Sequence, residues 1–257
     1  MLSNRVIPCL LLRNGGLVKT RKFSNPKYVG DPLNAIKIFN EKEVDELMVL
    51  DILASQDKRS PDFELIEKIA GECFMPLCYG GGISCYGDAK KIFSLGVEKI
   101  CIQSAAIFNP DLIRLITKDF GNQSVVVSVD VKRNWFGTPK LFSSLLRKSL
   151  NTPLLNHIQN CIELGAGEIL LNSVDKDGMM NGMDNELISE ISRKISIPLT
   201  AAGGASSLLD LKKAVESGAS AVAAGSMFVF HGPHQAVLIT YPDYENLESL
   251  FEKSYEE

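Results

Sequence analysis

Two glycine-rich stretches, and the serines that follow them, could bind phosphate. Gly80–Gly82 and Gly203–Gly204 each follow a short apolar run, and Ser104 and Ser226 each follow the next run along the chain. Glycine lets the backbone approach an anion because no Cβ intervenes. A serine that opens a helix adds free N–H groups and the positive end of the helix dipole. The alternative is that the glycines only make tight turns. The predicted phosphate contacts are Gly81, Gly82, Ser104, Gly203, Gly204, Gly225 and Ser226.

Carboxylates that end apolar runs are candidates for acid–base chemistry or ligand binding. Asp130 ends the valine-rich run Ser124–Asp130, where packing gives no reason for a charge, so we predict that it is catalytic. Aligning Val125–Lys132 with Val6–Arg13 places Leu11 opposite Asp130, so a second carboxylate is missing. Further candidates are Asp51, Asp175, Asp177 with Gly178, and Lys19. Lys19 belongs to Asn14–Gly30, a basic loop that is either a phosphate lid or simply solvated.

Four charges stand at or near the starts of apolar runs. They are Arg5, Glu46, Lys99 and Glu168. If the runs are parallel strands, the four meet at one end of the sheet, where two acids and two bases neutralise one another. A structural ring is one interpretation. The other is a gate into a central bore, which requires a partner docked on that face.

The elements that position these residues alternate along the whole chain. Amphipathic segments such as Asp62–Glu72, Asp88–Leu95 and Leu208–Ser217 separate eight apolar runs. This pattern predicts an α/β fold, a single (β/α)8 TIM barrel over residues 1–257, with a doubly wound open sheet as the alternative. The runs are Arg5–Leu12, Glu46–Asp51, Met75–Tyr79, Lys99–Ile102, Ser124–Asp130, Glu168–Leu171, Ile197–Ala201 and Ala219–Ala224.

An internal repeat divides the predicted barrel. Shifted by 122 residues, Glu46–Ala106 aligns with Glu168–Phe228 without a gap and with 16 identities over 61 positions. The matches centre on glycines, which indicates a two-fold half-barrel repeat. We predict half-barrels at about 1–123 and 124–240 and a C-terminal helix at 243–257. A repeat that carries two phosphate sites implies a long ligand with a phosphate at each end.

Composition excludes several classes of function. The chain has 31 acidic and 27 basic residues, a net charge of −4 and a pI near 5.5, which argues against nucleic-acid binding and a polybasic membrane surface. No apolar run approaches the ~20 residues of a spanning helix, and Met1–Arg13 resembles a strand rather than a signal peptide. Six scattered cysteines indicate reduced core thiols in a cytoplasmic protein, and three isolated histidines argue against zinc. We expect no metal and no cofactor.

Five motifs along the chain are specific to one family: Arg-x-Ile-x-Cys-Leu at 5–10, Gly-Asp-Pro at 30–32, Gly-Gly-Gly-Ile at 80–83, Gly-Ala-Gly-Glu-Ile-Leu-Leu at 165–171 and Asp-x-Asp-Gly at 175–178. Through them the sequence, from Met1 to about Phe230, resembles HisF, the cyclase subunit of imidazole glycerol phosphate synthase. The resemblance implies a HisH-like glutaminase on the barrel floor, an ammonia gate of Arg5, Glu46, Lys99 and Glu168, and a bis-phosphorylated substrate at the mouth.

Departures from the cyclase pattern leave three functions open. The cyclase has aspartate at the positions of Leu11 and Asp130, has asparagine at position 103, which is Gln103 here, and carries a glycine-rich hairpin that Trp135–Asn151 lacks. A paralogous branch, the AglZ- or WbuZ-type proteins, shares Ile-Pro-Cys-Leu-Leu-Leu at 7–12 and the tail at 228–239. That resemblance implies ammonia relay to a separate ATP-using amidotransferase that forms acetamidino groups on bacterial surface sugars. The alternatives are a working cyclase of histidine biosynthesis and a phosphosugar-binding regulator of a glutaminase.

Overall fold

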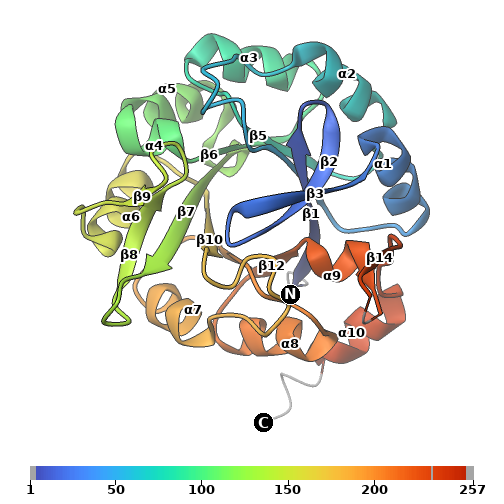
Figure 1. Ribbon diagram of the computed structural model, residues 1–257. Helices are drawn as coiled ribbons and strands as arrows, with labels where there is room; N and C mark the ends of the chain where they lie inside the picture. Colours follow the sequence, from blue (N-terminus) through green and yellow to red (C-terminus); the bar gives the residue numbers. More distant parts are fainter. Residues whose placement is uncertain (1–3, 233, 253–257) are drawn as a thin grey trace.

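Eight parallel strands close into a barrel (Figure 1). The computed structural model describes residues 4–232 and 234–252. Closure is shown by the pairing of the last barrel strand with the first, in which Arg5 lies opposite Ala221. The predicted (β/α)8 barrel is therefore confirmed, and the open doubly wound sheet is wrong. In order around the barrel the strands are β1 (Arg5–Arg13), β4 (Leu47–Asp51), β5 (Leu77–Gly80), β6 (Lys99–Ile102), β7 (Val125–Arg133), β10 (Glu168–Ser173), β11 (Leu199–Ala202) and β12 (Ala221–Ala224).

Helices surround the barrel and pack their apolar faces against it. Several begin at side-chain caps: Asp31, Asp62 and Asp184 each accept a hydrogen bond from a backbone N–H two or three residues into the helix. The predicted C-terminal helix is described as far as Glu252, and residues 253–257 lie outside the described residues, as do Met1–Ser3 of the predicted first strand. The helices are α1 (Pro32–Glu41), α2 (Phe63–Glu72), α3 (Tyr86–Ser94), α4 (Ser104–Phe108), α5 (Asp111–Phe120), α6 (Leu154–Glu163), α7 (Asn185–Ser192), α8 (Leu208–Glu216), α9 (Ser226–Val229) and α10 (Tyr244–Glu252), with a 3-10 turn at Asn122–Ser124.

The 122-residue shift of the sequence also relates elements of the structure. The bounds of β5 and β11, of α3 and α8, and of β6 and β12 each differ by that number. One local motif recurs with them: Asp88 accepts hydrogen bonds from the amide and hydroxyl of Ser84, and Asp210 accepts the same two from Ser206. The repeat therefore extends to the hydrogen bonds that start corresponding helices.

Two segments extend the barrel beyond its mouth, the end at which the strands finish. Asn14–Gly30, which we predicted to be a loop, is instead largely a hairpin of β2 (Gly16–Arg21) and β3 (Ser24–Gly30) that crosses in front of the barrel in Figure 1. Trp135–Asn151 also contains a hairpin despite its composition, because β8 (Pro139–Ser143) pairs with the end of β7, and β9 (Lys148–Ser149) pairs with β8. A third, short hairpin of β13 (Phe230–His231) and β14 (Ala236–Val237) follows α9.

The cysteines occupy more varied places than predicted. All six are free. Cys78, Cys101 and Cys161 are buried, Cys9 and Cys73 are half-buried, and the prediction of a core thiol is wrong for Cys85, which is exposed at the start of α3. Within the described ranges no helix is both long and apolar enough to cross a membrane. Nor does the described part of the chain bring together three side chains suited to holding a metal ion.

Candidate functional site

A cavity of about 590 Å³ opens at the mouth of the barrel. This is the end at which barrels of this class bind their ligands. Twelve of the thirteen candidates for catalysis or ligand binding line it. The prediction is wrong for Asp175, which does not line the cavity and instead accepts a hydrogen bond from the backbone N–H of Arg133. The twelve are Lys19, Asp51, Gly81, Gly82, Ser104, Asp130, Asp177, Gly178, Gly203, Gly204, Gly225 and Ser226.

The two glycine pairs form matching turns on opposite halves of the barrel. Gly81 and Gly203 have φ of +116° and +93°, a region that disfavours other residues. A Cβ on Gly81 would lie 2.4 Å from the carbonyl oxygen of Asp51, and one on Gly203 would lie 2.7 Å from that of Ser173. Helix α4 starts at Ser104 and α9 at Ser226, as predicted. Both turns therefore require glycine for their conformation and for close packing against neighbouring backbone, and phosphate binding there stays a prediction.

Asp130 is buried in the wall of the cavity, with 4% of its surface exposed. Gln103 Nε2 donates to one carboxylate oxygen at 2.6 Å and Ser128 Oγ to the other at 3.2 Å. Burial raises the pKa of Asp130 to about 7, and the negative charge of Asp177 raises it as well. The hydrogen bonds from Ser128, Asn172 and Gln103 lower the pKa and offset part of this shift. A carboxyl group that titrates near neutral pH can both donate and accept a proton, as general acid–base chemistry requires.

Gln103 is oriented by the β8 segment. The hydroxyl of Ser144 donates to Gln103 Oε1 at 2.7 Å, and Gln103 Nε2 donates to the carbonyl of Phe142 at 3.1 Å as well as to Asp130. These contacts fix which end of the amide faces the carboxyl group. Asn172, beside Asp130 on the neighbouring strand, has a buried Oδ1 without a partner among the described residues.

Leu11 lies on the opposite side of the mouth from Asp130. It lines the same cavity and pairs in register with Val18 of β2 and Leu50 of β4. Its environment is therefore apolar on both neighbouring strands. The position that would have carried the second carboxyl group therefore holds an apolar side chain, as the sequence predicts.

Lys19 and Asp177 join the β2–β3 hairpin to the loop after β10. Lys19 is only 5% exposed, its Nζ donates to the carbonyl of Cys9 at 2.5 Å, and burial lowers the pKa of its amine. Burial raises the pKa of Asp177, although the hydroxyl of Thr20, which donates to it at 2.9 Å, and the charge of Lys19 oppose the shift. The backbone N–H of Lys22 donates to the carbonyl of Asp177 at 2.9 Å. These bonds hold the hairpin over the mouth.

Asp51 is held on the other side of the mouth. One of its oxygens accepts the backbone N–H groups of Leu53 and Ala54 at 3.0 and 3.1 Å, and the other pairs with Arg59 at 3.3 Å. Its carboxylate therefore serves local structure as well as facing the cavity.

The four charges predicted at the barrel floor form a closed ring. Arg5 bonds to Glu46 and, at 3.0 Å, to Glu168, while Lys99 lies 2.8 Å from Glu46 and 3.2 Å from Glu168. The glutamates are almost fully buried, and the Lys99 side chain is 19% exposed. Burial opposes ionisation of Glu168, but Arg5, Lys99 and Thr200 outweigh it and hold its pKa below the ordinary value.

Between the ring and the mouth the barrel interior is apolar and rich in sulfur. Its buried cluster consists of Ile7, Met48, Cys78, Cys101, Val126, Leu170, Ala221 and Ala223, and Cys9, Leu50 and Ala202 pack against it. The charged floor and the polar mouth are thus separated by a layer without charges among the described residues.

Comparison with known proteins agrees with this arrangement. Residues 5–234 match the profile of a family described as "Histidine biosynthesis protein". A Pseudomonas aeruginosa protein provisionally named imidazole glycerol phosphate synthase subunit hisF2 is 54% identical over 96% of this chain and 99% of its own length. A Leptospira interrogans protein with the provisional name subunit HisF is 50% identical over 98% and 100%, and the Streptomyces griseus subunit HisF is 41% identical over 89% and 91%.

The chain belongs to the histidine biosynthesis protein family. The HisF resemblance inferred from its motifs is confirmed at that level. Three side chains of the site were given no role by sequence reasoning, although Gln103 was noted as a departure from the cyclase pattern. They are Thr200, whose hydroxyl donates to Glu168, and Gln103 and Asn172, which flank Asp130. The 122-residue shift relates Thr200 to Cys78, and no motif marks it, so only strand register could have identified it.

Proposed function

We propose that this HisF-like barrel is the ammonia-accepting subunit of a cytoplasmic glutamine amidotransferase. In this proposal a HisH-like glutaminase docks on the floor, ammonia passes the ring of Arg5, Glu46, Lys99 and Glu168, and the mouth binds a phosphorylated ligand. The barrel then relays the ammonia to a separate ATP-using amidotransferase, which forms an acetamidino group on a bacterial surface sugar. The observation that carries this choice over the cyclase is Leu11, which stands across the mouth from Asp130 where the cyclase pattern has its second aspartate.

The floor supports the proposed passage of ammonia because one contact of the ring is longer than the others, so the ring can open there. The Lys99–Glu168 contact, at 3.2 Å, is the longest of the ring, and the Lys99 side chain is partly exposed. Swinging Lys99 away leaves both glutamates paired with Arg5 and gives a neutral molecule access to the apolar interior. Charge reversal at Lys99 should therefore alter ammonia delivery between the subunits, and unchanged delivery contradicts the conduit.

The second candidate is the cyclase of histidine biosynthesis. It is favoured by the two matching glycine turns, which suit a ligand with two phosphates, and by the pKa of Asp130 near 7. Its difficulty is the missing carboxyl group at position 11: Asp130 would have to act alone, or another acid such as Asp51 would have to stand in. The loss of one proton donor or acceptor typically costs a factor of ~10²–10⁴ in rate.

Turnover of the ribulosyl bis-phosphate substrate with ammonium as nitrogen donor distinguishes the two. Ammonium bypasses the glutaminase, so only the mouth is tested. We expect no turnover by the natural protein and a large gain in Leu11→Asp. Leu11→Asn, of similar size but unable to exchange a proton, is the matched control and should gain nothing. Turnover by the natural protein at ~1 s⁻¹ or more identifies a cyclase and overturns the proposal.

A further inference from the structure

The mouth end carries an aromatic tip that no contact in the structure explains. Trp135 and Phe136 lie at the turn between β7 and β8 and are 97% and 90% exposed. The turn is rigidly held: Asn134 Oδ1 accepts the N–H groups of Phe136 and Thr138 at 3.0 and 2.9 Å. Arg133 adds a bond to the carbonyl of Gly137 at 2.8 Å and an ion pair with Asp184 at 2.9 Å. Two large apolar side chains are thus presented to solvent on a fixed support.

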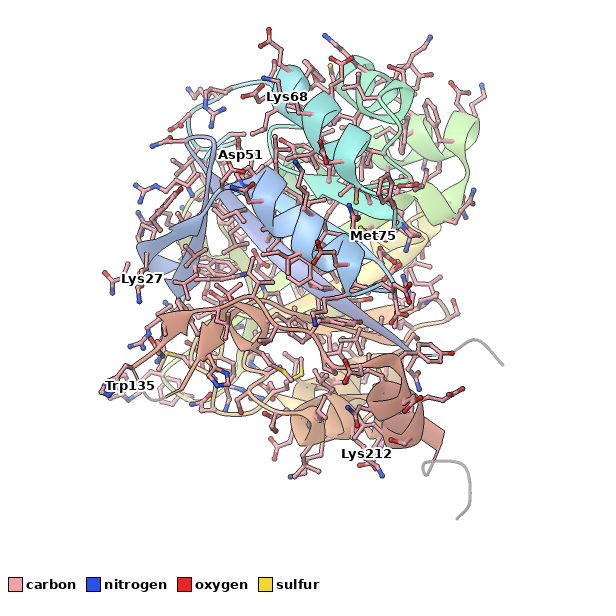
Figure 2. The ribbon with its side chains drawn as sticks, turned by 90° about the vertical axis from the view of Figure 1, so that its right-hand side faces the viewer. Lys27, Asp51, Lys68, Met75, Trp135 and Lys212 are labelled. Atoms are coloured by element: carbon pink, nitrogen blue, oxygen red, sulfur yellow. The ribbon has the colours of Figure 1, made fainter. Side chains whose placement is uncertain are left out.

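The segments that rise above the mouth have charge of one sign. Residues 14–30 and 131–153 contain 9 of the 27 lysines and arginines and none of the 31 aspartates and glutamates. Lys27, in the first segment, and Trp135, in the second, lie at the same end of the molecule, at the left edge of Figure 2. Tyr28, 66% exposed, adds a third aromatic side chain beside Lys27. Lys19 is buried and Arg133 pairs with Asp184, so the other seven bases carry the charge that a partner would meet. The nine bases are Lys19, Arg21, Lys22, Lys27, Lys132, Arg133, Lys140, Arg147 and Lys148.

We propose that this end of the barrel docks on an anionic lipid surface, with Trp135 and Phe136 entering the interface. Aromatic rings favour the headgroup region of a bilayer, and lysines and arginines beside them are attracted to acidic lipids. The bases are spread over two separate hairpins around a protruding tip, a distribution that suits a flat and diffuse negative surface. A second copy of this chain does not fit, because two such faces would repel each other.

Docking in this orientation has a consequence for the cavity. The mouth opens toward the headgroup layer, while the floor with its charged ring faces away from it. A phosphorylated ligand carried on a lipid could then reach the mouth without leaving the surface, and the floor stays accessible to another subunit. The net charge of −4 does not reveal this basic face, because all the acidic residues lie in the remainder of the chain and outweigh its bases.

The chain's single tryptophan makes the proposal directly measurable. The full-length protein is mixed with vesicles of phosphatidylglycerol and phosphatidylcholine, or of phosphatidylcholine alone, and Trp emission and co-sedimentation are recorded. We expect a shift of the emission to shorter wavelength and co-sedimentation with the acidic vesicles only, both weakened by added salt. Absence of the shift with acidic vesicles at low salt overturns the proposal.

Matched variants separate docking at this face from general adhesion. Phe136→Ala should weaken binding about tenfold, whereas Phe74→Ala, which removes an 87% exposed ring ahead of β5, should not. Lys27→Glu with Lys148→Glu should lower binding more than tenfold, and Lys68→Glu with Lys90→Glu, exposed on α2 and α3, should leave it unchanged. Equal losses in either pair contradict the proposal. An emission shift caused by a purified glutaminase or amidotransferase subunit, but not by vesicles, assigns the face to a protein partner and overturns it.

Discussion

Replacing Asp130 with asparagine should stabilise the protein, and the gain should grow with pH. The carboxyl group of Asp130 is buried, and its pKa is raised from the ordinary 3.8 to about 7. A raised pKa means that the folded state holds a proton which the unfolded chain releases between pH 4 and 7. Stability is therefore lost as pH rises through this window. Asparagine does not titrate, so the variant avoids that loss.

The size of the effect follows from the shift. At 1.36 kcal/mol per pKa unit, the natural protein loses about 4 kcal/mol between pH 4 and pH 8, and about 2 kcal/mol of it by pH 5.5. The amide fits the existing bonds: its oxygen can accept from Gln103 Nε2, and its nitrogen can donate to the hydroxyl oxygen of Ser128. No new unsatisfied group should offset the gain.

Urea denaturation followed by circular dichroism at pH 5.5 and pH 8 measures the difference. We expect Asp130→Asn to exceed the natural protein by about 4 kcal/mol at pH 8 and by about half of that at pH 5.5. Asp57→Asn, on the exposed loop after β4, is the control and should show no pH-dependent gain. A variant that is less stable than the natural protein at pH 8, or equally stabilised at both pH values, refutes the reasoning.

Two further substitutions test the floor and the hairpin. Glu168→Gln removes a carboxylate bonded to Arg5 and Lys99 and should cost about 2 kcal/mol in urea denaturation at pH 7. The cost should fade below about pH 4, because the pKa of Glu168 is lowered in the folded protein. The control is Glu190→Gln, which removes a carboxylate from an exposed ion pair with Lys194 and should cost under ~0.5 kcal/mol. Gly178→Ala places a Cβ 1.8 Å from the carbonyl oxygen of Thr20 and should cost more than about 2 kcal/mol. Gly15→Ala, at a similar φ with nothing within 4 Å, should cost about 1 kcal/mol, and equal costs contradict a role for Gly178 in seating the hairpin.

The sequence revealed the barrel strands because burial on both faces makes them continuously apolar. The hairpin strands lack this signal. Residues 24–29 of β3 are mostly exposed and include Pro26, so nothing in the segment alternates, and its pairing with β2 depends on a neighbour. In the same way β8 is fixed by the register of Val131 with Leu141. Both hairpins are tertiary features that local patterns do not specify.

The residues of the candidate site also fall into two groups, those that local sequence identifies and those that depend on tertiary structure. Glycines and charges at strand ends follow from residue type and position. Twelve of the residues predicted at the mouth therefore line the cavity, Asp175 being the exception, and the four charges predicted at the floor form the ring. Thr200 and Gln103 act through where their side chains point, and that depends on strand register and on the β8 segment.

The two halves of the barrel match at the two predicted phosphate sites. They match only in part at the floor ring, which is the predicted ammonia gate. The 122-residue shift relates Glu46 to Glu168, so each half supplies one acid of the floor ring. It relates Lys99 to Ala221 and Cys78 to Thr200, so the bases and the supporting hydroxyl are not repeated. Glu168 therefore keeps a bond from Thr200 when Lys99 moves, whereas Glu46 then depends on Arg5 alone. In the proposed ammonia conduit, this asymmetry favours opening of the ring at the longest of its contacts, the 3.2 Å contact between Lys99 and Glu168.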